Sequence, residues 1–319
     1  MNPRIEASPS APAVTVALDR AVELLARRQL PYGEIPIRRF DTLTLEGEGR
    51  LDTSPFVTSF ALLALDLVDH PLAPAIRRRA EAFLLEEREA PGVWRYWSSR
   101  SGAPIDPDLD DTCVVSFALH GVAALDGDNV ATILANRHPS GLFKTWLRDP
   151  EADNDVDGVV NANVLLYLGE RPETTAARDI VSAAINEDRE SQSTIYYLAP
   201  LALYHAVARA YAHGVRGFSA CREAVLAKVE APRGPLDALS AALRIATRLG
   251  FGASGGALDD DVRFLLASQS PDGSFARAAF YTGPEPPAPH AVWWGSEELT
   301  TALAIEALAR YRALAGAAR

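Results

Sequence analysis

The sequence predicts an all-α fold, a single (α/α)6 barrel of six helical hairpins. Three observations lead to this fold. Apolar residues recur with helical periodicity, segments with one polar face alternate with segments that are apolar nearly all round, and the alternation occurs six times. A helix without a polar face is buried on all sides, so six such helices ringed by six amphipathic ones form a closed barrel. An open solenoid would need polar capping repeats, which the sequence lacks.

The first helix of each hairpin is amphipathic. In the first hairpin Leu18, Val22 and Leu25 lie on one face, and charged residues occupy the other. In the second, Ile76 and Ala80 repeat this pattern against a run of arginines. The six amphipathic helices are expected, in order, near residues 13–29, 73–89, 127–138, 174–188, 219–230 and 257–269.

The second helix of each hairpin is apolar nearly all round. Residues 56–65 read FVTSFALLAL, residues 113–125 read CVVSFALHGVAAL, and residues 159–168 read VVNANVLLYL. These helices are therefore expected to line the centre of the barrel. In order, they lie near residues 53–68, 110–125, 157–168, 194–211, 235–249 and 297–312.

Four long connections lead from an amphipathic helix to the apolar helix that follows. All four must then lie at one end of the barrel, where the inner helices begin, and long loops in a compact domain are usually functional. They are residues 30–52, 90–109, 139–156 and 270–296. No Pro/Gly/Ser linker divides the repeats, so residues 1–319 are expected to form one domain with a flexible N-terminus over 1–12.

Composition excludes several classes of function. The 319 residues carry a formal net charge of −11, which disfavours nucleic acid and anionic membranes as partners. No apolar stretch is long enough for a transmembrane helix, and the start lacks the apolar run of a signal peptide. Cys113 and Cys221 are the two cysteines, so no structural metal site is expected. We expect a cytoplasmic protein.

Three aspartates open the second apolar helix. Asp108, Asp110 and Asp111 stand within four residues of one another. Aspartate is favoured at a helix N-cap and in the first turn, so capping explains one or two of them. A third carboxylate crowded against these is repelled, and close carboxylates push a proton onto one another. The cluster therefore predicts either a heavily capped helix or a carboxylic acid that stays protonated.

This segment resembles a known family. Residues 107–119, PDLDDTCVVSFAL, are similar to the DxDD signature of class II terpene cyclases, the group of squalene–hopene cyclase and copalyl diphosphate synthase. Residues 269–275, QSPDGSF, resemble a weak form of the family's Gln-to-Trp repeat motif. The resemblance implies that Asp110 protonates a terminal alkene or epoxide of a linear isoprenoid, with Asp108 and Asp111 tuning and orienting it. The family's β domain is likewise a six-hairpin barrel.

The sequence departs from the family in two ways. Cys113 replaces the usual alanine, and the chain holds one barrel where full-length members place the site between two. Either the long loops close the site, or a homodimer or a second barrel subunit supplies the other wall, or the activity is lost. The resemblance implies no required cofactor, with Mg²⁺ for a substrate that bears a diphosphate. Glu46 and Glu48 are candidates to hold that ion.

Other polar and aromatic residues near the loops are candidates to bind the substrate. Ring faces stabilise a cation, arginine forks match a diphosphate, and amides orient an acid or substrate. Each also has a structural explanation: a packed ring, a solvated charge or a satisfied buried amide. The candidates are Asn161, Asn163, Tyr196, Tyr197, Trp97, Trp294, Arg38 and Arg39.

Three other functions remain open. A zinc enzyme like the protein-prenyltransferase β subunit would use Asp111, Cys113 and His290. A non-catalytic barrel would bind an isoprenoid or a partner protein. A carbohydrate-active barrel would oppose Asp110 with Asp157 or Glu297 across a groove. A deep apolar cavity at Asp110 would favour cyclisation, and a shallow polar groove would favour carbohydrate.

Overall fold

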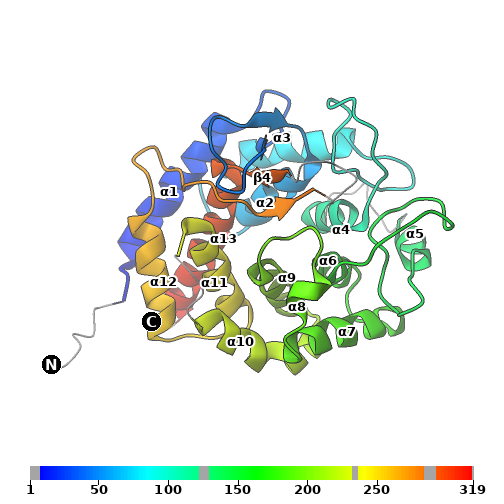
Figure 1. The fold of residues 1–319 in the computed structure, drawn as a ribbon. Helices are drawn as coiled ribbons and strands as arrows, with labels where there is room; N and C mark the ends of the chain where they lie inside the picture. The colour runs from blue at the N-terminus through cyan, green and yellow to red at the C-terminus, as the bar shows by residue number, and fades with distance from the viewer. Residues whose placement is uncertain (1–7, 122–128, 232–235, 284–291, 318–319) are drawn as a thin grey trace.

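A ring of six helices forms the centre of the molecule (Figure 1). The computed structural model describes residues 8–121, 129–231, 236–283 and 292–317. Each inner helix packs on the next, and the last closes the ring on the first. The six are α2 (Pro55–Leu65), α4 (Leu109–Ala118), α6 (Gly158–Leu168), α9 (Pro200–Ala212), α11 (Ala238–Gly250) and α13 (Glu297–Ala317).

Six further helices surround the ring. They are α1 (Ala11–Arg28), α3 (Ala73–Glu86), α5 (Val130–Ala135), α7 (Thr175–Asn186), α10 (Arg222–Glu230) and α12 (Gly256–Ala267). Short elements join them: η1 (Pro172–Thr174), α8 (Glu190–Ser193) and η2 (Arg216–Cys221). The structure thus confirms the predicted (α/α)6 barrel of six hairpins. No helix in the described part of the chain is both long and apolar enough to cross a membrane.

Two helix starts differ from the sequence prediction. Helix α1 begins at Ala11, inside the stretch 1–12 that was expected to be flexible, because Ser10 caps it by accepting a hydrogen bond from the amide of Ala13. Helix α9 begins at Pro200 rather than near 194, since proline suits the first turn of a helix and disfavours a helical residue before it. Parts of three expected helices lie outside the described residues, namely 122–125, 127–128 and 235, as do residues 1–7.

A small antiparallel sheet, which the sequence analysis did not predict, joins two of the long loops. Its strand order is β2-β1-β4-β3. The strands are β1 (Ile37–Phe40), β2 (Arg50–Asp52), β3 (Tyr281–Thr282) and β4 (Trp293–Gly295). Strands this short carry no period that a sequence pattern could reveal.

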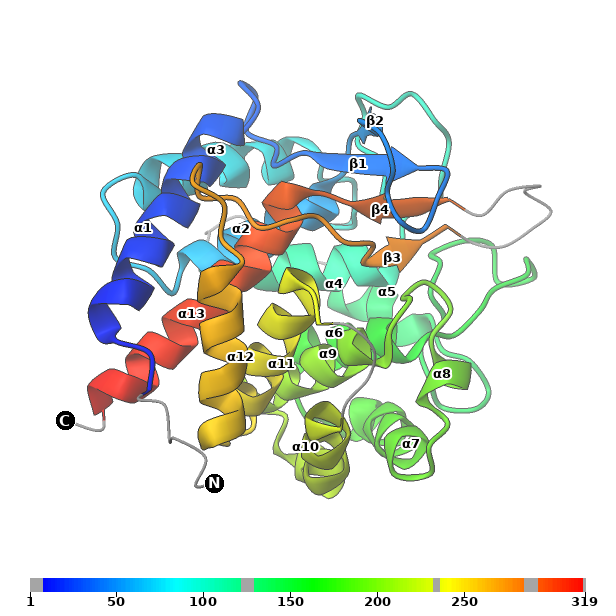
Figure 2. The same cartoon turned by 60° about the vertical axis from the view of Figure 1, so that its left-hand side comes forward.

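The four long loops meet at one end of the barrel, as predicted. Strand pairing joins loop 30–52 to loop 270–296, and an isolated bridge from Asp108 to Trp146 joins loops 90–109 and 139–156. A further bridge from Tyr197 to Tyr281 connects the start of α9 to the sheet. Figure 2 shows strands β1, β4 and β3 side by side above α4.

The segment that resembles the Gln-to-Trp motif follows α12 and connects it to α1 and α13. The amide nitrogen of Gln269 donates to the carbonyls of Ala17 in α1 and of Gly273. The amide of Phe275 donates to the hydroxyl of Thr301 in α13. Gly273 has φ +92°, and a Cβ there would lie 2.3 Å from the carbonyl oxygen of Arg20, so this close approach requires glycine.

Candidate active site

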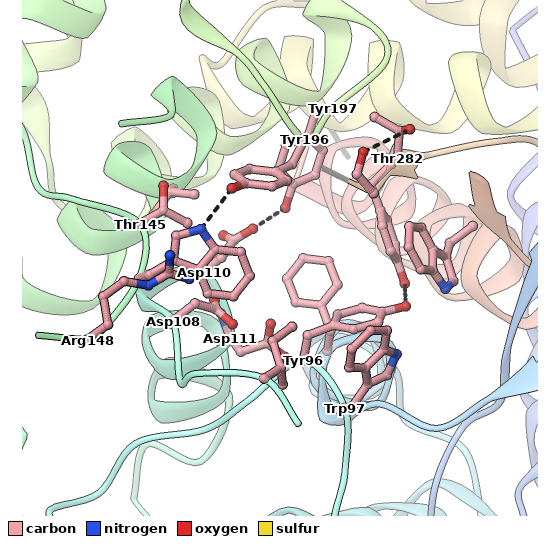
Figure 3. Close-up of a pocket in the computed structure, with 17 residues that line it drawn as sticks. Tyr96, Trp97, Asp108, Asp110, Asp111, Thr145, Arg148, Tyr196, Tyr197 and Thr282 are labelled. Atoms are coloured by element: carbon pink, nitrogen blue, oxygen red, sulfur yellow. Dashed lines mark hydrogen bonds between the residues drawn. The ribbon is translucent and has the colours of Figure 1, made fainter. Parts of the chain in front are cut away.

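A cavity of about 330 Å³ opens at the barrel end where the loops meet (Figure 3). Inner helices α2, α4 and α6 supply its floor, and loops 90–109, 139–156 and 270–296 supply its sides. Asp108, Asp110 and Asp111 lie on one side, and Tyr96 and Trp97 face them from another. The chain's own loops therefore enclose the aspartate cluster.

Asp108 is the N-cap of α4. Its Oδ1 accepts a 2.8 Å hydrogen bond from the amide of Asp111, and its side chain is buried. The capping interpretation of the cluster therefore holds for Asp108. It does not account for Asp110, whose carboxyl makes no hydrogen bond to the start of its own helix.

Asp110 is bonded by two side chains from other helices or segments. Asn163 of α6 donates to its Oδ1 over 2.6 Å, and the hydroxyl of Tyr197 donates to its Oδ2 over 2.5 Å. Asp110 itself lines the cavity and is partly exposed to it. Two neutral donors on one carboxyl stabilise its ionised form, so these two bonds by themselves favour release of a proton from Asp110.

Burial opposes ionisation of all three aspartates. Burial, together with the charge of Asp110, raises the pKa of Asp108 to about 7. Burial and the charges of both neighbours raise the pKa of Asp111 well above its usual range. Burial also raises the pKa of Asp110, but the bonds from Tyr197 and Asn163 and the charge of Arg209 act in the opposite direction. The cluster therefore retains protons, and the conjugate base of Asp110 is the best supported.

The cavity wall carries a buried hydroxyl without a partner. Thr145 Oγ1 makes no hydrogen bond within the described part of the chain. Asp108 and Asp111 bond each other through their side chains, which requires a proton on one of the two carboxyl groups. All three residues line the cavity. An unpaired buried polar atom is costly, so this wall is suited to contact a polar group or water that enters the cavity.

Carboxylates behind the wall hold two pairs of aromatic rings. Asp52 Oδ2 accepts from the indole nitrogens of Trp97 at 3.1 Å and Trp294 at 2.7 Å. Asp155 Oδ2 accepts from the hydroxyl of Tyr196 at 2.5 Å and from the indole of Trp146 at 3.3 Å. The polar edge of each ring is bonded outward, which leaves apolar surface toward the cavity.

No family model matches the sequence, and no curated protein matches it. Solved structures do match. The type II terpene cyclase MstE from Scytonema, in complex with geranylgeranyl dihydroxybenzoate (substrate), superposes with a TM-score of 0.70 at 15% identity, covering 95% of this chain and 99% of that one. The chain has the fold of a type II terpene cyclase.

Two further structures share the barrel. The ent-copalyl diphosphate synthase from Streptomyces platensis matches with a TM-score of 0.55 at 17% identity, over 80% of this chain and 50% of that one. A possible member of the GH105 family from Salmonella enterica matches with a TM-score of 0.57 at 13% identity, over 99% and 97%. Because unrelated chemistries share this barrel, function must be argued from the site.

Within this cyclase fold, the sequence-predicted candidates separate into two groups. Tyr196, Tyr197, Trp97 and Trp294 line the cavity together with the three aspartates. Asn163 lies directly behind Asp110 and contacts it. These residues form one continuous site.

The other candidates lie elsewhere. The amide of Asn161 bonds both backbone groups of Phe143 and thereby anchors loop 139–156. Arg38 and Arg39 belong to β1 and do not line the cavity, and Arg38 donates to backbone carbonyls of the β1–β2 loop.

The candidate metal ligands lie away from the cavity lining or outside the described residues. Glu46 and Glu48 are exposed in the β1–β2 loop, away from the cavity lining. Cys113 is buried in the core, and burial raises the pKa of its thiol well above the usual range. His290 lies outside the described residues. Within the described ranges, no group of three His, Cys, Asp or Glu side chains is arranged to hold a metal ion.

Sequence reasoning missed three residues. Arg148 lines the cavity, where its guanidinium lies 4.9 Å from the Trp146 ring and pairs with Asp106 at 3.0 Å. Tyr281 of β3 also lines it, and its hydroxyl is 3.0 Å from that of Tyr96. Arg209 lies behind Asp110, where it bonds Asn163. Of these three, only Arg209 could have been noticed in the sequence, because it is a charged residue inside an otherwise apolar helix.

Proposed function

We propose that this protein is a class II terpene cyclase that starts cyclisation by protonating a terminal alkene or epoxide of a linear isoprenoid. The observation that carries the proposal is the setting of Asp110. Its carboxyl lies on the wall of an aromatic cavity, retains a proton by burial, and has two donors ready for the charge it leaves behind.

The chemistry needs no redox centre and no nucleophile. The O–H bond of Asp110 breaks, a C–H bond forms at the terminal alkene carbon, and the adjacent carbon becomes a cation. Successive double bonds then supply electron pairs that close rings. Loss of a proton from the last cation to water completes an isomerisation, and Asp110 regains its proton from the solvent.

The surrounding residues serve this sequence of steps. Tyr197 and Asn163 stabilise the carboxylate of Asp110 after proton transfer. The faces of the wall rings stabilise the cations, and their enclosure limits water that would capture a cation early. Asp108 and Asp111 act as protonated neighbours that orient the acid, which agrees with their raised pKa values.

The cavity supports a proposal for the substrate class. Apolar and aromatic side chains dominate its wall, which suits a prenyl chain. A protein of the same fold, MstE, holds geranylgeranyl dihydroxybenzoate as substrate. We extend this class, a prenyl chain with a polar head, to the present chain, with Mg²⁺ needed only if the head is a diphosphate. Because its own loops enclose the cavity, we propose that the lone barrel is competent without a second subunit.

The carbohydrate alternative is less favoured by the site. Asp157, one acid proposed to oppose Asp110, is occupied: its carboxylate accepts from the amides of Val159, Val160, Ile195 and Tyr196. The other, Glu297, pairs with Arg28 at 3.5 Å.

Turnover in deuterated buffer tests the proposal. The purified protein is incubated with geranylgeranyl dihydroxybenzoate and other linear prenyl compounds. A cyclised product of unchanged mass is expected in ordinary water, with one added deuterium in D₂O. Asp110→Asn should lower the rate by at least about 10²-fold, because the general acid is lost. Asp153→Asn, in the exposed part of loop 139–156, serves as the control. Full turnover by Asp110→Asn, or no cyclised product from any prenyl substrate, would overturn the proposal.

A further inference from the structure

A buried arginine lies behind the proposed acid. Arg209 of α9 is only 4% exposed. Its Nη2 donates to Asn163 Oδ1 over 2.9 Å, and its guanidinium lies 4.8 Å from the centre of the Phe60 ring. Its Nε and Nη1 have no hydrogen-bond partner among the described residues. No carboxylate therefore pairs with this guanidinium directly.

Arg209 decides which way the Asn163 amide faces. A guanidinium has only donors, so the atom of Asn163 that meets it must be the carbonyl oxygen. The NH₂ group of Asn163 must then face Asp110 Oδ1, where it lies at 2.6 Å. Without Arg209 the amide is free to turn its oxygen toward the carboxyl, which would repel the ionised form.

Two carboxyl groups, Glu306 and Asp110, attract the charge of Arg209. Glu306 is bonded by Arg310 at 3.0 Å and lies 3.1 Å from His205 Nε2. Burial lowers the pKa of His205, so this histidine is neutral near pH 7. Glu306 is shared among His205, Arg310 and Arg209, so an ionised Asp110 adds to its compensation of the Arg209 charge.

We propose that Arg209 is a positioning residue for the acid: it orients the Asn163 amide and compensates the negative charge that appears on Asp110 when the proton leaves. This role deepens the proposed cyclase function and rests on it for its catalytic meaning. The electrostatic part, however, can be measured without any substrate.

Other groups also face Asp110 and contribute to its titration. They must be considered together with Arg209, because titration in such a cluster belongs to the whole set. From the elements packed around Asp110, these groups are Asp108, Asp111, Cys113, Asp157, Tyr197 and Tyr281. None of them changes in an Arg209 variant, so a difference from wild type reports on the arginine.

The substrate-free test follows the infrared band of protonated carboxyl groups as pH rises. The contribution of Asp110 is the part that disappears in Asp110→Asn. In Arg209→Gln its midpoint should move upward by about one pH unit, since a nearby positive charge is removed. Arg209→Lys, which keeps the charge, should bring the midpoint most of the way back to the wild-type value. Arg248→Gln is the matched control, because Arg248 is a buried arginine of α11 that pairs with Asp261 instead.

The kinetic test uses geranylgeranyl dihydroxybenzoate as the probe. A weaker acid should lower kcat by about 10-fold, while the loss of activity at high pH moves to higher pH. Loss of a residue with only a structural role would lower kcat without raising the pH at which activity is lost. Circular dichroism and a thermal melt establish that each variant is folded.

The outcomes separate the two proposals. An unshifted midpoint in folded Arg209→Gln, or an equal shift in Arg248→Gln, overturns the role of Arg209. An upward shift with no cyclised product from wild type supports the electrostatic role and counts against the cyclase function.

Discussion

The hydroxyl of Tyr197 donates a 2.5 Å hydrogen bond to Asp110 Oδ2 and so joins residues 87 positions apart in the chain. Tyr197 is itself held in place, because Asp157 accepts from the backbone amides of Ile195 and Tyr196 just before it. The acid of α4 is therefore positioned by a segment that the first turn of α6 anchors.

Removal of the Tyr197 hydroxyl should weaken the acid. A hydrogen bond to a charged group contributes about 1.5–3 kcal/mol, so Tyr197→Phe should lower kcat by roughly 10-fold or more. The high-pH limb of activity should move upward, because a donor to the carboxylate is lost. Tyr196→Phe loses a hydroxyl that bonds Asp155 instead, and should leave the limb in place. Identical profiles for the two variants would contradict this assignment.

Removal of the Asp52 carboxylate should loosen the aromatic wall. Asp52→Ala frees the indole N–H groups of Trp97 and Trp294, at a cost of about 2 kcal/mol in the free energy of unfolding. Because Asp110 is untouched, substrate should still be consumed, but more product should be partly cyclised or captured by water. Chromatographic separation with mass spectrometry measures the product mixture, and tryptophan fluorescence measures the loosening of the wall. Asp41→Ala, an exposed carboxylate beside the same sheet, is the control.

Glu34 should make stability fall as pH rises. This buried carboxyl accepts from the Ser54 amide and the Tyr32 hydroxyl, and burial raises its pKa from 4.5 to about 7. The folded state therefore binds the Glu34 proton more tightly than the unfolded state does. The stability that this proton contributes is fully present below pH 4.5 and is lost as pH rises through 7.

Glu34→Gln should remove this part of the pH dependence. Relative to wild type, the variant should gain at most about 3 kcal/mol between pH 4.5 and 8.5, measured by urea unfolding. Glu23→Gln, on the exposed side of α1, provides the comparison. Parallel curves for Glu34→Gln and wild type would show that Glu34 does not titrate in this range.

Asp157 should matter more to stability than an ordinary cap. Its carboxylate accepts hydrogen bonds from four backbone amides, two in α6 and two in the segment before Tyr197. Asp237, the N-cap of α11, accepts a hydrogen bond from one backbone amide. Asp157→Ala should cost about 3 kcal/mol and Asp237→Ala about 1 kcal/mol, as measured by urea unfolding. Equal losses would mean that the bonds to Ile195 and Tyr196 contribute little.

Much of the architecture was predictable because it depends on local periodicity. An all-round apolar segment such as 56–65 has to be buried, and six of them alternating with amphipathic helices close into a ring. The same logic placed the long loops at one end and the three aspartates at the mouth, because an aspartate favours the first turn of a helix.

The partners of Asp110 could not be predicted, since they are set by which helices become neighbours in the closed ring. Asn163, Tyr197 and Arg209 each lie 50 or more positions from it, and no spacing rule connects them. Arg38 and Arg39 had the right chemistry for a diphosphate, but the register of a short strand turned them elsewhere. The sequence by itself determined the helices and the place of the three aspartates at the start of one of them. Only the tertiary structure decided what surrounds the acid, because contact between distant segments depends on packing rather than on pattern.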